Sequence, residues 1–127
     1  MTPSVPISWG ELIDKLTILE IKSERLTSET ARDNVRRERE ALAKIAAAVE
    51  REPKLAPLRA GLKRVNETLW QIEDDIRAKE AAKSFDAGFV ELARAVYHNN
   101  DERGRLKREI NALLGSDIVE EKQYSAY

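Results

Sequence analysis

The sequence contains no cysteine, and residues that interrupt helices or bind metals are scarce. Among its 127 residues there are four prolines, five glycines and one histidine. The absence of cysteine excludes disulfides, thiolate catalysis and cysteine-ligated zinc, and a single histidine cannot build a typical zinc site. The sequence therefore predicts a fold without covalent cross-links, and we expect neither a bound metal nor a cofactor.

Long apolar runs are also missing. No stretch approaches the ~18 consecutive apolar residues of a membrane-spanning helix, and residues 1–7 lack the basic and then apolar pattern of a secretion signal. We therefore expect a cytoplasmic protein without a membrane span. Net charge is −1, and the basic residues at 36–39 and 103–108 alternate with acids. This pattern is typical of solvated helix faces, so we expect no nucleic-acid partner.

The composition that remains favours long amphipathic helices. Charged residues make up 35% of the chain and hydrophobic residues 42%, with alanine, leucine, glutamate, lysine and arginine prominent. We predict an all-α fold, an antiparallel bundle of about four helices in a single domain over residues 1–127. Residues 1–7 are predicted to be an extended arm, and residues 116–127 a C-terminal tail.

The first helix begins with a capping box, because Ser8 is followed three residues later by Glu11. Its leucines form one apolar stripe, whereas Ile18 and Ile21 point to another side. A helix that is apolar on two sides is expected to be sandwiched, either inside the bundle or at a subunit contact.

Three further helices are predicted over about 30–51, 58–82 and 87–114. Pro53 and Pro57 mark the break before the second of these, and Gly115 is placed to end the last one. Apolar residues in 58–82 alternate three and four positions apart, which predicts a heptad-like, coiled-coil seam. The short break near Ser84 makes the last two helices an antiparallel hairpin.

The apolar stripe of the last helix is interrupted by Asn99 and Arg103. Buried amides and guanidinium groups need partners, because leaving them unpaired costs a few kcal/mol. Antiparallel pairing places several polar residues near this interruption, and Lys107 lies one turn further along. The candidate ligand-binding residues are Asn66, Glu73, Asn99, Asn100, Arg103, Lys107, Glu11 and Asp14. They form either a satisfied structural network or a site for an anionic small molecule.

No residue pattern identifies a catalytic group. His98 has no G-x-S-x-G partner motif, and no glycine-rich phosphate loop is present. Glu11 and Asp14 form one E-x-x-D pair, but the E-x-x-E pair that precedes it in all-α nucleotide pyrophosphohydrolases is missing. Ile18, Ile21 and Trp70 are the candidate interaction residues. The isoleucines lie on the second apolar side of the first helix, and Trp70 either packs under that helix or anchors a partner or second subunit.

Several longer strings resemble a family of small, uncharacterised bacterial all-helical proteins, a domain of unknown function, over nearly the whole chain. These strings are GELIDKLTILEIK (10–22), LWQIEDDIR (69–77), FVELARAVY (89–97), NDER (100–103), KREIN (107–111) and EEK (120–122). The resemblance implies a bacterial cytoplasmic protein that works near glycosyl-transfer or envelope-polysaccharide enzymes. It implies no catalytic role for any residue.

Two functional hypotheses follow. The first is a non-enzymatic interaction or accessory module that binds a protein partner or a second copy of itself through Ile18, Ile21 and Trp70. The alternative is a small-molecule site, in which Arg103 and Lys107 bind an anion, asparagines donate hydrogen bonds and Glu73 acts as acid or base. This alternative includes an enzyme of sugar or envelope-polysaccharide metabolism.

Overall fold

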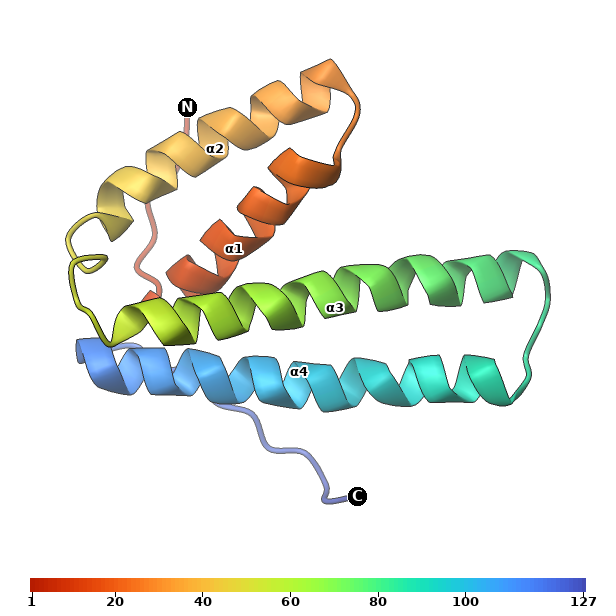
Figure 1. Ribbon diagram of the computed structural model, residues 1–127. Coiled ribbons are helices and arrows are strands. Elements are labelled where there is room, and N and C mark those ends of the chain that lie inside the picture. Colours follow the sequence, from red (N-terminus) through yellow and green to blue (C-terminus); the bar gives the residue numbers. More distant parts are fainter.

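The computed structural model describes residues 1–127 and contains four α-helices and no strand, which confirms the all-α prediction. The helices are α1 (Trp9–Arg25), α2 (Glu29–Ala46), α3 (Leu55–Ala81) and α4 (Ala87–Leu114). Helices α3 and α4 form a long antiparallel hairpin, and α1 and α2 lie across one end of it (Figure 1).

Side-chain caps and a glycine set most of the helix ends. Ser8 Oγ accepts a hydrogen bond from Glu11 N at 3.1 Å at the start of α1, as the capping box predicts. Ser28 and Asp86 cap α2 and α4 in the same way. Gly115 ends α4 with a φ of 65°, in the left-handed region that glycine adopts without strain.

Two predicted boundaries were wrong. Helix α3 begins at Leu55, so Pro57 lies in its first turn and does not precede it. Proline is tolerated there, because the first N–H groups of a helix have no intrahelical acceptor. Helix α2 ends at Ala46, and residues 47–51 continue as turns.

The core lies at the end of the hairpin that α1 and α2 cover. Helix α1 contributes Leu12, Ile13 and Leu16, which pack on residues of all three other helices. The residues from the other helices are Ala46, Leu55, Leu62, Leu106 and Ile110. These side chains are at most 5% exposed, so this end of the molecule has a dry apolar interior.

The opposite end of the hairpin has no such interior. We call residues 73–98 the hairpin arm; it projects beyond α1 and α2 in Figure 1. No residue of the arm is buried, although Ile76, Phe89 and Leu92 continue the apolar stripes of α3 and α4. None of the four helices contains an apolar stretch long enough to cross a bilayer.

Candidate functional site

One face of α1 carries polar residues into the interior. Gly10, Asp14, Thr17 and Ile21 recur four or three positions apart and are all buried, so they share one side of the helix. Buried polar groups are almost always hydrogen-bonded. The partners of Asp14 and Thr17 come from α3 and α4.

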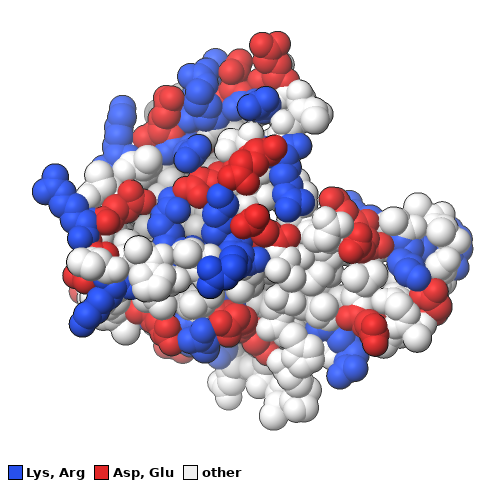
Figure 2. Space-filling model, viewed as in Figure 1, with Lys and Arg blue, Asp and Glu red and all other residues white.

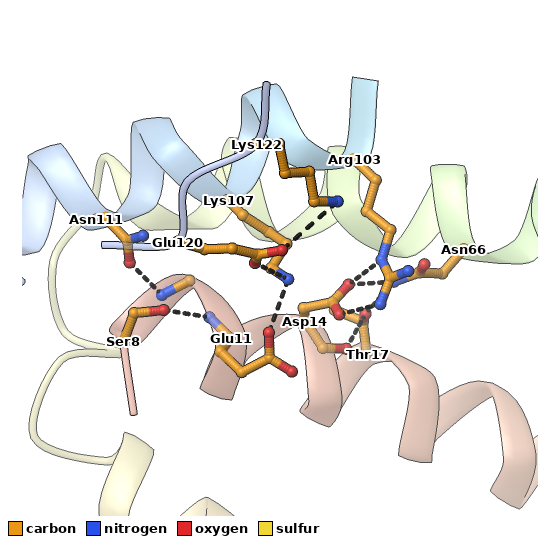
Figure 3. Close-up of polar contacts among 11 residues, drawn as sticks. Ser8, Glu11, Asp14, Thr17, Asn66, Arg103, Lys107, Asn111, Glu120 and Lys122 are labelled. Atoms are coloured by element: carbon orange, nitrogen blue, oxygen red, sulfur yellow. Dashed lines mark hydrogen bonds and ion pairs between the residues drawn. The ribbon is translucent and has the colours of Figure 1, made fainter. Parts of the chain in front are cut away.

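Asp14 is the centre of this polar contact and is 1% exposed. Its Oδ1 accepts hydrogen bonds from Arg103 Nε at 2.9 Å and from Asn66 Nδ2 at 2.8 Å. Its Oδ2 accepts a third from Arg103 Nη2 at 2.5 Å. Asn66 also donates to Thr17 Oγ1 at 2.9 Å. We call these four residues the polar layer, and Figure 3 shows their side chains closing on one another.

The polar layer satisfies its own charges. The hydrogen bonds that Arg103 donates to Asp14 raise the pKa of the Arg103 guanidinium. A bidentate arginine–carboxylate pair also has a defined geometry. Removing one partner of a buried pair costs about 3–5 kcal/mol. The layer therefore fixes the position at which α1 crosses the hairpin.

Lys107 forms a second polar contact one turn along α4. It is 5% exposed, and its Nζ lies 2.7 Å from Glu11 Oε2 and 2.6 Å from Glu120 Oε2 in the C-terminal tail. Burial by itself lowers the pKa of Lys107, but the hydrogen bonds to both carboxylates outweigh it and the pKa is raised. The ammonium group is therefore held charged and joins α1, α4 and the tail.

Gly10 and Asn111 complete the contact between α1 and α4. Gly10 N donates to Asn111 Oδ1 at 2.6 Å, and a Cβ at Gly10 would lie 2.5 Å from the Lys107 carbonyl oxygen. Only glycine permits the two backbones to approach this closely. Neither residue stands out from local sequence patterns, although both fall within the strings 10–22 and 107–111.

A separate ionic cluster joins α1 to α2 and α3 and was not predicted. Glu20, with a 14% exposed side chain, lies 2.5 Å from Arg59 Nη2, 3.5 Å from Lys63 Nζ and 3.8 Å from Arg39 Nη2. Burial raises the pKa of Glu20, but Arg59 and the other cations outweigh this and lower it. Because Glu20 and Arg59 are far apart in the sequence, no local spacing pattern reveals the contact.

Three candidate residues do not join the polar layer. Glu73 is exposed and accepts a hydrogen bond from Arg77 Nε at 2.7 Å. Asn99 Nδ2 donates to the Ala95 carbonyl of its own helix at 2.8 Å and lines a surface hollow that contains no α1 residue. Asn100 is half-buried and makes no hydrogen bond to the layer. Glu73 nevertheless lines the same surface groove as Asn66 and Arg103. Asn99 and Asn100 do not, so the predicted convergence of these two asparagines with the layer was wrong.

An open groove of about 470 Å³ lies beside the layer. We call it the Trp70 groove. Ile18, Ile21, Leu69, Trp70 and Arg103 are among its lining residues, so it contains all three candidate interaction residues. Ile21 is only 1% exposed, whereas Ile18 and Trp70 are half-buried. The Arg25 guanidinium carbon lies 5.9 Å from the centre of a Trp70 ring, within range of a cation–π contact.

Comparison with known proteins gives a family but no activity. No curated protein and no solved structure matches the chain. A family of unknown function (DUF6165) matches residues 3–127, which include the polar layer, the Trp70 groove and the hairpin arm. Since the match covers almost the whole chain, the protein belongs to this family of unknown function, DUF6165.

Proposed function

We propose that this protein is a non-enzymatic interaction module, and that its hairpin arm pairs with the arm of a second copy of the chain. The observation that carries the proposal is the lack of any buried residue in the arm, despite its regular apolar stripe. A bacterial, cytoplasmic setting is part of the proposal and rests on the sequence resemblance.

The state of the polar layer favours this function over a ligand site in the layer. Arg103 directs its Nε and Nη2 at Asp14, and Asn66 donates to the same carboxylate. A binding or catalytic site needs groups that converge on an open space. Here the groups converge on one another, which supports a structural role for the layer.

The arm resembles half of a helical bundle. Ile76, Phe89, Leu92 and Val96 are half-buried between two helices, while Phe85 and Val90 are 58% and 53% exposed. Two helices alone leave one side of such a seam open to water, and four-helix packing is the common way to cover it. A second copy supplies two more helices with the same seam.

Symmetry and charge also favour a second copy as the partner. A two-fold interface uses the same surface on both subunits, and an elongated antiparallel hairpin can lie against its own copy along its full length. The arm contains acids, Glu73 to Asp75, as well as bases such as Arg77 and Arg94. A surface with both signs can pair with itself without leaving like charges opposed.

The oligomeric state of a variant with a charge in the seam tests this proposal. We expect the wild type to sediment as a dimer and the Ile76→Glu variant to sediment as a monomer with unchanged helix content. Dimer formation would bury the glutamate carboxylate in the seam, and removing this charge from water is costly. The matched control is Ile45→Glu, which places the same charge at a 57% exposed isoleucine of α2. This control should remain a dimer.

Val90→Glu provides a second arm variant in case Ile76→Glu disturbs the hairpin itself. Val90 is exposed in the monomer, so this change should weaken the dimer and leave the thermal midpoint of the dissociated monomer unchanged. A wild type that is monomeric at all accessible concentrations, or a dimer that survives both arm variants, contradicts the proposal.

A further inference from the structure

Four residues on one face of α4 form a polar site that the interaction function does not use. Gly104, Lys107, Arg108 and Asn111 recur three, one and three positions apart, which places them on the same side of the helix. They line a small cavity together with Glu120 and Lys122 of the C-terminal tail. Its volume is about 10 Å³, close to that needed by a single water molecule.

Asn111 has an unused hydrogen-bond donor in this cavity. The residue is 3% exposed, and its Nδ2 has no partner. The orientation of the amide is determined, because Gly10 N is a donor and must face the amide oxygen at 2.6 Å. A buried N–H group without an acceptor is costly, so the cavity lacks an acceptor that Asn111 is placed to bind.

Arg108 is a second group without a charged partner. It makes none of the ion pairs found in the structure. Its Nη1 lies 3.4 Å from the position that a Cβ of Gly104 would occupy, so the guanidinium lies over the bare backbone of that residue. Glycine at this position leaves room for a group beside Lys107 and Arg108.

Glu120 already places a carboxylate in this environment. Figure 3 shows its side chain between Lys107 and Lys122, at 2.6 Å and 3.5 Å from their Nζ atoms. The carboxylate belongs to a tail without regular secondary structure, which follows the end of α4 at Leu114. The end of the tail is also held on α4, where the Tyr127 hydroxyl donates to Asp101 and the Tyr127 ring packs against Tyr97 and His98. These exposed contacts and the pair with Lys107 are the ones that must break when Glu120 leaves the site.

We propose that the α4 face of Gly104, Lys107, Arg108 and Asn111 binds an external oxyanion, a carboxylate or phosphate group, and that Glu120 is an internal ligand that competes for it. When the tail leaves, it removes Glu120 and Lys122 together. Lys107 then keeps its ion pair with Glu11 but loses the one with Glu120, and Arg108 has no ion-pair partner, so an external anion can take the place of the Glu120 carboxylate. Asn111 Nδ2 supplies a hydrogen bond that Glu120 does not accept.

Titration of the full chain with inorganic phosphate, and separately with acetate, tests the site. Glu120→Gln removes the competing charge, so we expect phosphate affinity about tenfold above that of the wild type, as when a binding-competent state becomes fully populated. The matched control is Glu121→Gln, which removes the neighbouring tail carboxylate and should bind as the wild type does. Arg108→Gln in the Glu120→Gln background should reverse the gain.

The side-chain amide signals of Asn111 in an NMR spectrum provide a direct readout. They should shift in a saturable manner with phosphate, acetate or both, and sodium chloride at equal ionic strength should leave them unchanged. The response to the two anions distinguishes a phosphate site from a carboxylate site. Equal phosphate affinities for Glu120→Gln and Glu121→Gln, or an Asn111 amide that does not respond to either anion, would overturn the proposal.

Discussion

The two ends of the α3–α4 hairpin are built from the same pair of helices but have different surroundings. Near the end that holds Leu62 and Ile110, α1 covers the seam and both side chains are fully buried. In the hairpin arm the apolar spacing continues through Ile76 and Leu92, but neither residue is buried. The difference teaches that periodicity sets which side of a helix is apolar, whereas burial depends on a covering element (Figure 1).

The polar layer lies where the covered end gives way to the arm. Arg103 is the α4 member of the layer and follows the arm along that helix, and it binds Asp14 of α1. In Figure 2 charged groups crowd the surface around α1 and α2, and the surface towards the arm is more mixed with uncharged atoms. The layer thus holds α1 over one end of the hairpin, and the arm at the other end stays uncovered by α1 (Figure 1).

Removing a carboxylate at each end of the hairpin is expected to give the largest difference in the free energy of unfolding. Asp14→Ala leaves Arg103 and Asn66 without their acceptor and should lower the free energy of unfolding by about 3–5 kcal/mol. Glu73→Ala in the arm breaks only the exposed pair with Arg77 and should cost less than about 1 kcal/mol. Urea denaturation of both variants, followed by circular dichroism, measures the difference. Equal losses would show that the layer does not anchor α1.

A methyl group at two buried glycines gives the next largest contrast. Gly10→Ala places a Cβ 2.5 Å from the Lys107 carbonyl oxygen, so α1 and α4 must separate, at a cost of about 1–3 kcal/mol. At Gly61 the nearest atom would be a flexible Leu106 methyl at 3.5 Å. Gly61→Ala should therefore be neutral, or stabilising by up to about 1 kcal/mol. Thermal midpoints that fall equally in both variants would contradict the close helix contact.

The acid stability of the Glu20 cluster is a smaller effect. Arg59 and its neighbours lower the pKa of Glu20 below its ordinary value. Ionised Glu20 therefore stabilises the folded state at pH values above the pKa that it has in the unfolded chain. This stabilisation is lost as the pH falls through its lower pKa in the folded protein. We expect Glu20→Gln to be less stable than the wild type near pH 7, by about 1 kcal/mol, and to approach it in acid. A difference that stays constant from pH 7 to pH 3 would argue against this ionic cluster.

Much of the fold followed from local sequence patterns. The capping box at Ser8, the break before α4 and Gly115 at its end each depend on residues a few positions apart, and each was predicted. Pro57 misled the prediction of the α3 boundary, because proline is compatible with both a break and a first helical turn. Local spacing alone does not distinguish these two cases.

The candidate site was harder to predict, because it depends on which side of the hairpin α1 covers. The interrupted stripe of α4 singles out Arg103 from sequence alone, and antiparallel pairing of the two long helices brings Asn66 close to it. Asn99 lies in a surface hollow that contains no α1 residue. Glu73 lines the groove beside Ile18 and Ile21 of α1 but pairs with Arg77 and does not join the layer. Asn111 carries no charge and does not interrupt the stripe, so its importance emerges only from its contact with Gly10.

Amide hydrogen exchange at two protein concentrations tests the difference between the ends most directly. If the arm is covered by a second copy, protection in the arm helices, residues 73–81 and 87–98, should rise with protein concentration, since dimer formation depends on it. At low protein concentration, where the arm is unpaired, amide protection around Leu62 and Ile110 should exceed protection in the arm. An arm whose exchange is independent of concentration would contradict pairing through the arm.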